Sequence, residues 1–109
     1  MIWQVKFFQT ARGNYPVKDF IDDLGLATQT KVAKHIRLLI NYGPYLRPPY
    51  SKKLWRELYE LRITGKNAIR IIYAIVNNIY YLLHAFKKKT DKIPQNELKI
   101  ALDRMREII

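Results

Sequence analysis

The sequence predicts an α+β domain of the order β-α-α-β-β-β-α, in which helices pack against a small antiparallel sheet. Residues 51–63, 68–76 and 80–90 form three runs rich in Ile, Leu, Tyr and Val, and turn residues separate them. Such runs are typical of consecutive antiparallel strands. Apolar side chains at three- and four-residue spacing before and after these runs indicate the helices.

The first half of the chain is expected to form one strand and two helices. Aromatic and aliphatic residues alternate with polar ones over residues 2–8, which predicts a strand. Pro16 suits the first position of a short helix that Gly25 ends. A longer helix is expected over residues 28–41, before the break at Gly43. The apolar stripe of this helix comprises Val32, Ile36, Leu39 and Ile40.

The three runs are expected to form a meander whose pleat separates two sets of side chains. Thr64–Asn67 and Asn77–Asn78 supply the turns. One face of the first run carries Tyr59, Leu61 and Ile63, and the other carries Leu58, Glu60 and Arg62. In the second run Ile69, Ile71, Tyr73 and Ile75 oppose Arg70, Ile72 and Ala74. Two arginines therefore lie on otherwise apolar strands, and the third run ends in a lysine cluster.

A final helix is expected after Pro94, because apolar residues recur there at helical spacing. These residues are Leu98, Ala101, Leu102, Met105 and Ile108. The core is expected to include Tyr59, Leu61, Ile71, Tyr73, Leu83 and Phe86. His84 is interpreted as a core residue on the same face as Leu82, and His35 as a surface or half-buried residue.

Composition indicates a single domain over residues 1–109. With 49% hydrophobic residues, the chain can bury a modest core. It contains no cysteine, which excludes disulfides and thiolate metal sites and fits the cytoplasm. No signal peptide or membrane span is expected, because the N-terminal residues lack a long apolar run. No metal or cofactor is expected, because Glu57, Glu60 and Asp91 are scattered.

The charge of the chain is concentrated in its middle. The chain has 20 Lys and Arg residues against 9 Asp and Glu, a net charge of +11. Residues 24–90 contain 13 of the basic residues and only the acids Glu57 and Glu60, so this segment holds the whole excess. Such asymmetry favours a polyanionic partner, and nucleic acid is preferred over a membrane. The alternative is a solvated basic surface that maintains solubility.

Three blocks carry a resemblance to a known family. They are LYELRI at Leu58–Ile63, IRIIYA at Ile69–Ala74 and LLHAFKKKTDKIPQNELKIALDR at Leu82–Arg104. The chain resembles the RelE/HigB superfamily of toxins, and within it the phage-derived HigB-like branch. This resemblance implies a RelE-like fold and the toxin of a type II toxin–antitoxin system, acting as a ribosome-dependent, metal-independent mRNA endoribonuclease. It also implies a helix-turn-helix (HigA-like) antitoxin as partner, besides mRNA and the ribosome.

RNA cleavage by the 2′-hydroxyl needs a proton acceptor, stabilisation of the charged phosphorane and a proton for the 5′-oxygen. Fixed cations stabilise the charged phosphorane. By resemblance, Arg70 is the phosphate clamp, and Arg62 either orients Arg70 or holds the RNA backbone. Lys88 and Lys89 match the basic residues that close the last strand. One of these lysines is a candidate proton donor or acceptor, because an amine among other cations loses its proton more readily.

Further basic residues are expected to bind RNA or the ribosome. They are Lys52, Lys53, Arg56, Lys66 and Lys87. Trp3, Trp55 and Tyr80 are candidates for base stacking or for the core. The alternative for the two arginines is a structural bridge to Glu57 or Glu60. Some relatives carry a lysine where Glu60 stands and an aromatic base where Leu98 and Lys99 stand, so the general base is unassigned.

Two other function classes stay open at this point. One is a ParE-like, gyrase-inhibiting toxin of the same fold, which binds a protein and cuts nothing. The other is a non-catalytic basic RNA-binding module, although the sequence has no phosphate-cradling Gly loop or zinc ligands. The convergence of arginines and lysines argues for the nuclease, because a pure binder does not need it.

Overall fold

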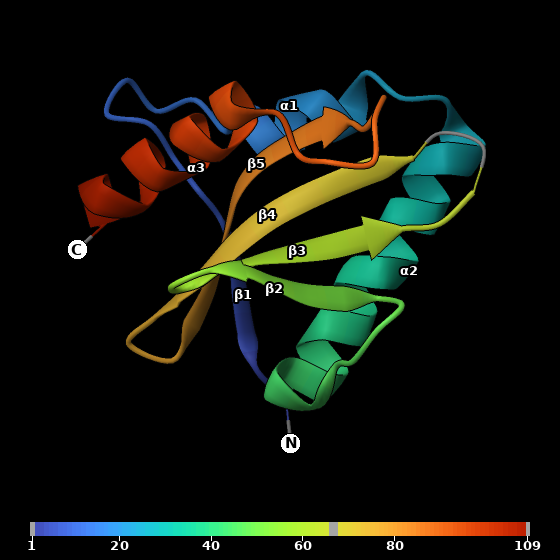
Figure 1. The fold of residues 1–109 in the computed structure, drawn as a ribbon, viewed down its shortest axis with the longest axis horizontal. Helices are drawn as coiled ribbons and strands as arrows, with labels where there is room; N and C mark the ends of the chain where they lie inside the picture. Colours follow the sequence, from blue (N-terminus) through green and yellow to red (C-terminus); the bar gives the residue numbers. More distant parts are fainter. Residues whose placement is uncertain (1, 66–67, 109) are drawn as a thin grey trace.

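The computed structural model describes residues 2–65 and 68–108, and it confirms the predicted α+β class and order of elements. One strand is added to the predicted set. In chain order the elements are β1 (Gln4–Phe7), α1 (Pro16–Asp22), α2 (Leu26–Tyr42), the short 3-10 helix η1 (Gly43–Tyr45), β2 (Ser51–Trp55), β3 (Leu58–Ile63), β4 (Ile69–Val76), β5 (Ile79–Lys87) and α3 (Gln95–Ile108), as Figure 1 shows.

The added strand arises because residues 51–63 fold as a hairpin, not as one strand. Arg56 adopts a φ of 51°, which lets the chain reverse between β2 and β3. The left-handed conformation costs a non-glycine residue roughly 1–2 kcal/mol. The guanidinium of Arg56 lies 4.5 Å from the ring centre of Trp55, and this cation–π contact offsets part of the cost. The sequence concealed the turn because it contains no Gly, Asn or Pro there.

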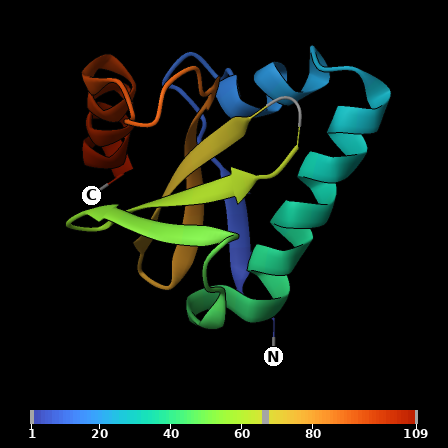
Figure 2. The ribbon, with the colours of Figure 1, turned by 45° about the vertical axis from the view of Figure 1, so that its right-hand side comes forward.

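The sheet has five strands in the order β1-β5-β4-β3-β2. β1 pairs with β5 in parallel, and every other pair is antiparallel. Helices α1 and α2 cover one face and α3 covers the other, which Figure 2 shows from the side. Within the described residues, no helix is long and apolar enough to cross a lipid bilayer.

Both faces of the sheet contribute to the hydrophobic core. The buried residues on the α1–α2 side are Val17, Val32, Leu39, Leu61, Ile63, Ile69, Ile71, Tyr73, Tyr80, Leu82 and Ala85. Those on the α3 side are Phe8, Leu58, Ile72, Ala74, Leu83, Phe86, Ala101 and Met105. The predicted alternation along β3 and β4 is thereby confirmed. The predicted core residues are buried, except that Tyr59 is half-buried against the first cluster.

Two local predictions need correction, and a third is not tested. Gly25 does not end the first helix; α1 ends at Asp22, and Gly25 instead caps the start of α2 with an extended φ and ψ. His35 is buried, and its Nδ1 lies 2.8 Å from the carbonyl oxygen of Lys31, because α2 turns this position toward the sheet. The predicted turn at residues 64–67 includes Lys66 and Asn67, which lie outside the described residues.

Truncating Leu61 to Ala tests the assigned core. Leu61 is fully buried between the sheet and the helices α1 and α2, so the change leaves a cavity. We expect the free energy of unfolding to fall by about 2–5 kcal/mol in urea titrations. Leu26→Ala is the matched control, because Leu26 is 82% exposed at the start of α2. Equal stability of the two variants would contradict the register of β3.

Alkaline unfolding tests the buried tyrosine of β4. The hydroxyl of Tyr73 lies 2.8 Å from Oγ of Ser51, and burial raises the pKa of Tyr73 to about 12. The unfolded chain loses this proton near pH 10, so the stabilisation is complete below about pH 10 and is lost as the pH rises toward 12. We expect the free energy of unfolding to decline over this interval, and to decline less in Tyr73→Phe. Parallel declines in both proteins would contradict the assignment.

Candidate functional site

Arg62 and Arg70 face each other on neighbouring strands. The pairing of β3 with β4 sets Arg62 directly opposite Arg70, between the pairs Leu61–Ile71 and Ile63–Ile69. Because those apolar pairs point toward α1 and α2, the pleat turns both arginines to the α3 side. Figure 1 shows α3 crossing the other half of this face, so the C-terminal end of β3 and the start of β4 extend beyond the helix. We call Arg62 and Arg70 the arginine pair.

A buried carboxylate joins the arginine pair. Glu60 is 1% exposed, and its Oε1 accepts a hydrogen bond from Nε of Arg62 at 2.6 Å. The same oxygen lies 3.2 Å from Nε of Arg70, a close ion pair without the alignment of a hydrogen bond. The side chains of Arg62 and Arg70 keep 28% and 14% of their surface exposed. Of the two acids considered from the sequence, Glu60 therefore bridges the pair; Glu57 lies exposed in the β2–β3 turn.

The arginine pair keeps its charge despite its partial burial. Burial lowers the pKa of Arg70, the charge of Glu60 opposes that change, and the charge of Arg62 adds to the lowering. Guanidinium groups remain protonated in proteins, so neither arginine can act as a general acid or base. Glu60 engages the Nε side of both groups, and Nη1 of Arg70 donates to the carbonyl oxygen of Ile69 at 3.1 Å. A bound oxyanion would meet the remaining terminal nitrogens.

Two of the predicted lysines lie close to the arginine pair. Lys88 follows β5, and its backbone N–H donates to the carbonyl of Ala68 at 2.7 Å, next to the start of β4. Its side chain is half-buried. Lys52 pairs with Glu60 across β2 and β3, which sets it on the same face of the sheet, and its side chain is exposed. The carboxylate of Glu60 thus contacts Arg62 and Arg70, Lys52 lies opposite Glu60 on the neighbouring strand, and Lys88 lies next to the start of β4.

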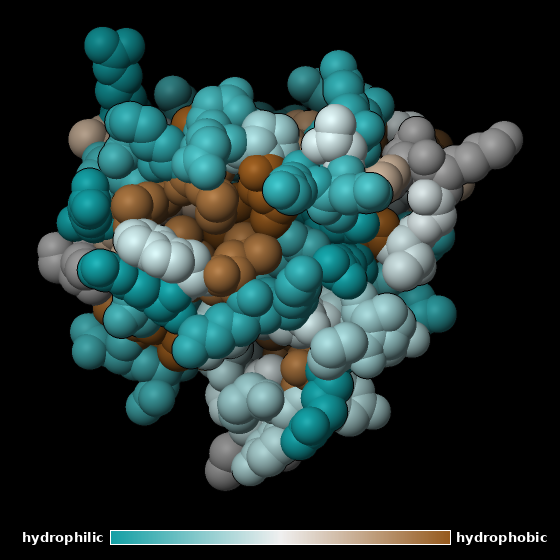
Figure 3. Space-filling view, viewed as in Figure 1, coloured by the Kyte–Doolittle hydropathy of each residue, from teal (hydrophilic) through white to brown (hydrophobic). Residues whose placement is uncertain are grey.

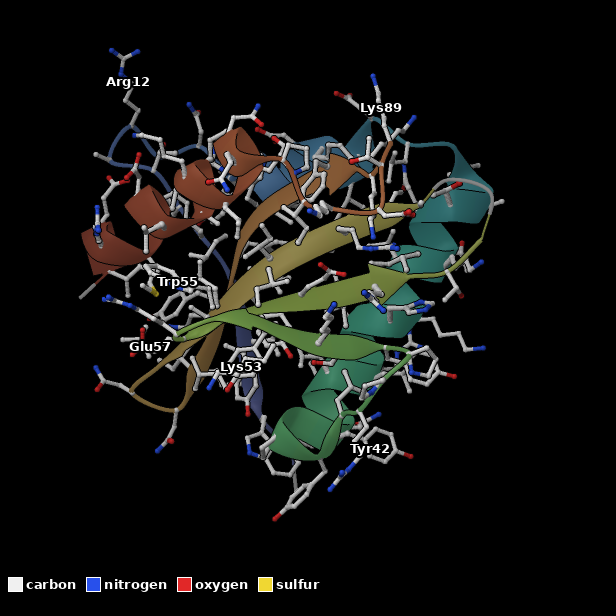
Figure 4. The ribbon with its side chains drawn as sticks, viewed as in Figure 1. Arg12, Tyr42, Lys53, Trp55, Glu57 and Lys89 are labelled. Carbon is white, nitrogen blue, oxygen red and sulfur yellow. The ribbon has the colours of Figure 1, made fainter. Side chains whose placement is uncertain are left out.

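The other predicted site residues are more dispersed. Lys87 pairs with Ile69 and so faces the α2 side, and Lys89 extends away from the end of β5 (Figure 4). Lys53 pairs with Tyr59 on the α2 side as well. Arg56 lies in the β2–β3 turn, roughly 20 Å of strand away from Arg62. Lys66 lies outside the described residues.

A second polar cluster ties α3 to β5. Nε2 of His84 donates to Oε1 of Glu97 at 3.0 Å, and Nη1 of Arg104 lies 3.3 Å from Nδ1 of His84. Arg104 also donates to the carbonyl of Leu83 at 2.8 Å, and burial lowers its pKa. Both ring nitrogens of His84 are therefore occupied, so it anchors α3 rather than acting as a free base.

The position of His84 differs from the predicted one because β5 contains a bulge. Ile72 pairs with His84 while Tyr73 pairs with Leu82, so one residue is skipped between them. The skip sets His84 on the α3 side and Leu82 in the core on the α1–α2 side. The ring of His84 stacks on Phe86 at 5.7 Å, and Phe86 pairs with Arg70. The cluster with Glu97 thus flanks the arginine pair.

Comparison with protein families now adds to this geometry. Residues 19–106 match the family described as Phage derived protein Gp49-like (DUF891). The chain belongs to this Gp49-like family. It is a HigB-like group of toxins within the RelE superfamily. The match spans every predicted site residue and excludes β1. A comparison with curated proteins yields no match.

The Gp49-like chain also has an apolar groove that the sequence did not indicate. The groove has a volume of about 630 Å³ and lies between α3 and the β2–β3 hairpin. Its apolar lining consists of Leu54, Trp55, Leu58, Leu98 and Leu102. Figure 3 shows it as a hydrophobic hollow, and Trp55 at its edge is 46% exposed. We call it the α3–hairpin groove. The other two candidates for base stacking differ, since Tyr80 is buried and Trp3 is half-buried.

The acidic and histidine side chains do not form a metal centre in the described part of the chain. No group of three or more His, Cys, Asp or Glu residues within 2–65 and 68–108 is arranged to hold a metal ion. The arginine pair itself offers fixed positive charge that can be directed at an oxyanion.

Proposed function

We propose that this Gp49-like protein is the toxin of a type II toxin–antitoxin system and cleaves mRNA in the ribosome without a metal. The observation that carries the proposal is the arginine pair: two guanidinium groups side by side at the open end of a basic sheet. The family supports the toxin class, and the arginine pair supports phosphoryl chemistry.

In the proposed reaction the 2′-oxygen of the RNA attacks the adjacent phosphorus. The bond from phosphorus to the 5′-oxygen breaks, which leaves a 2′,3′-cyclic phosphate and a 5′-hydroxyl. Arg70 stabilises the negative charge that develops on the phosphorane, and Arg62 holds the neighbouring oxygen. Lys88, the lysine next to the start of β4, provides the proton for the 5′-oxygen. The 2′-proton passes to a base in the assembled complex, where the ribosome positions the mRNA.

Binding to the ribosome is assigned to the basic residues outside the proposed catalytic set. Lys52, Lys53, Arg56, Lys66 and Lys87 provide positive charge that attracts RNA without fixing a sequence. Contacts of this kind weaken at higher salt, because the counterions that binding releases from the RNA then gain less entropy. The proposal therefore separates binding, which depends on many cations, from cleavage, which depends on the arginine pair.

Replacement of Arg70 by Ala tests the catalytic assignment. Because the contact with Arg70 strengthens as charge builds on the phosphate, cleavage should fall by about 10²–10³-fold and ribosome binding only slightly. Arg70→Lys should restore part of the rate, since a lysine lacks the two-pronged geometry of arginine. Rates are measured by mapping mRNA 5′-ends on ribosomes in vitro and after induction in cells. Arg37→Ala is the matched control, because Arg37 is an exposed cation on α2.

Three outcomes would each contradict part of the proposed nuclease mechanism. If Arg70→Ala still cut mRNA at the same sites and rates, the arginine pair would not be catalytic. If the parent arrested growth with intact mRNA and gyrase-linked DNA breaks, the chain would be a gyrase toxin. If the parent bound ribosomes and cut nothing, it would be an RNA-binding module.

We also propose that a helix-turn-helix, HigA-like antitoxin binds this protein at the α3–hairpin groove. The leucines and the exposed Trp55 favour an apolar segment of the partner, and the net charge of +11 favours acidic residues around that segment. A partner in this groove would lie beside the face that carries the arginine pair, since both features are on the α3 side of the sheet.

Trp55→Ala tests the antitoxin surface. Large aromatic side chains in apolar pockets often contribute 2 kcal/mol or more, so affinity for the product of the adjacent reading frame should fall by roughly 30-fold or more. Isothermal titration measures this affinity. Tyr42→Ala is the control, because Tyr42 is 52% exposed at the opposite end of the molecule from Trp55 (Figure 4). If no complex forms with the parent, the partner proposal fails; if only Tyr42→Ala weakens it, the surface lies elsewhere.

A further inference from the structure

Glu60 occupies an unusual place for an acidic residue in a protein proposed to bind phosphate. Its carboxylate is itself an oxyanion, and it lies between the two guanidinium groups that would hold the substrate. Its side chain is only 2% exposed, so solvent does little to screen it. The charge of Glu60 must therefore affect any anion that binds the arginine pair.

The local charges can be counted. Arg62 and Arg70 contribute two positive charges and Glu60 contributes one negative charge, so the buried centre of the site carries a net charge of +1. Without Glu60, two like charges would face each other across β3 and β4, which is destabilising. Lys52 and Lys88 add charge at the edge, and on the other side of Phe86 the pair of His84 and Glu97 faces the site.

We infer that Glu60 is a specificity-determining residue: by lowering the charge of this centre from +2 to +1, it weakens the electrostatic preference for a terminal phosphomonoester over an internal phosphodiester. A phosphodiester carries one negative charge. A phosphomonoester carries between about 1.5 and 2 negative charges at neutral pH. This inference rests on the proposed role of the arginine pair as the phosphate site.

The inference has a quantitative consequence. Removing one negative charge close to the ligand changes the binding free energy in proportion to the charge of the ligand. A dianion therefore gains about twice as much free energy as a monoanion, and its fold-change in affinity is about the square. For charges about 6 Å apart at an effective dielectric constant of about 40, the gain is roughly tenfold for a diester and roughly a hundredfold for a dianion.

The test compares two ligands that the protein cannot cleave. One is a deoxydinucleoside monophosphate, which has a single internal phosphodiester, and the other is a deoxynucleoside 3′-monophosphate. Affinities for the full chain at pH 7.5 come from NMR titrations of the Nε–H signals of Arg62 and Arg70. Glu60→Gln retains an acceptor for Arg62 and removes the charge. Glu57→Gln is the matched control, because Glu57 is exposed in the β2–β3 turn.

We expect Glu60→Gln to raise the ratio of monoester to diester affinity by roughly tenfold, and Glu57→Gln to leave it unchanged. Arg62→Gln lowers the charge of the centre to zero, so it should lower the same ratio; it keeps the test decisive if Glu60→Gln does not fold. An unchanged ratio in Glu60→Gln or Arg62→Gln would overturn the inference. The result is independent of cleavage: a shifted ratio in a protein that cuts no mRNA would uphold the inference and reject the nuclease.

Discussion

The contact among Glu60, Arg62 and Arg70 depends on the register of two central strands. Leu61–Ile71 and Ile63–Ile69 are buried pairs on the α1–α2 side, and the arginine pair lies between them on the other side. A slip of one residue in either strand would turn the arginine of that strand into the apolar core. The hydrophobic pairs therefore hold the charged site in place, and Glu60 lowers the cost of keeping two cations adjacent.

The sheet face that bears these charges has an apolar region and a charged region. Near the β2–β3 turn it is apolar and packs under α3 through Leu58 and Ala74. Toward the other end it is charged and extends beyond the helix. His84, Glu97 and Arg104 fix α3 where the two regions meet. The anchored helix leaves the arginine pair open on one side and forms the wall of the α3–hairpin groove on the other.

This division gives the Gp49-like chain two surfaces of opposite character. In the proposed function the apolar groove binds a protein partner, while the arginine pair and nearby lysines bind RNA. Both are on the α3 side of one small sheet. A partner that fills the groove and a substrate that meets the arginine pair would thus be close neighbours, which is a physical basis for neutralisation of a toxin by its antitoxin.

The sequence by itself determined the α+β class, the alternation along β3 and β4, and the position of one arginine on each of these two strands. These features follow from short-range periodicity, which a strand imposes on its own residues. The sequence also limited the acid that could bridge Arg62 and Arg70 to Glu57 or Glu60. The tertiary structure decided which acid bridges, because the β2–β3 turn exposes Glu57 and the pleat buries Glu60. It alone revealed the turn at Arg56, the bulge that aims His84 at Glu97, and the groove beside Trp55. Each of these depends on contacts between elements, or on backbone geometry that they stabilise, and no local pattern encodes them.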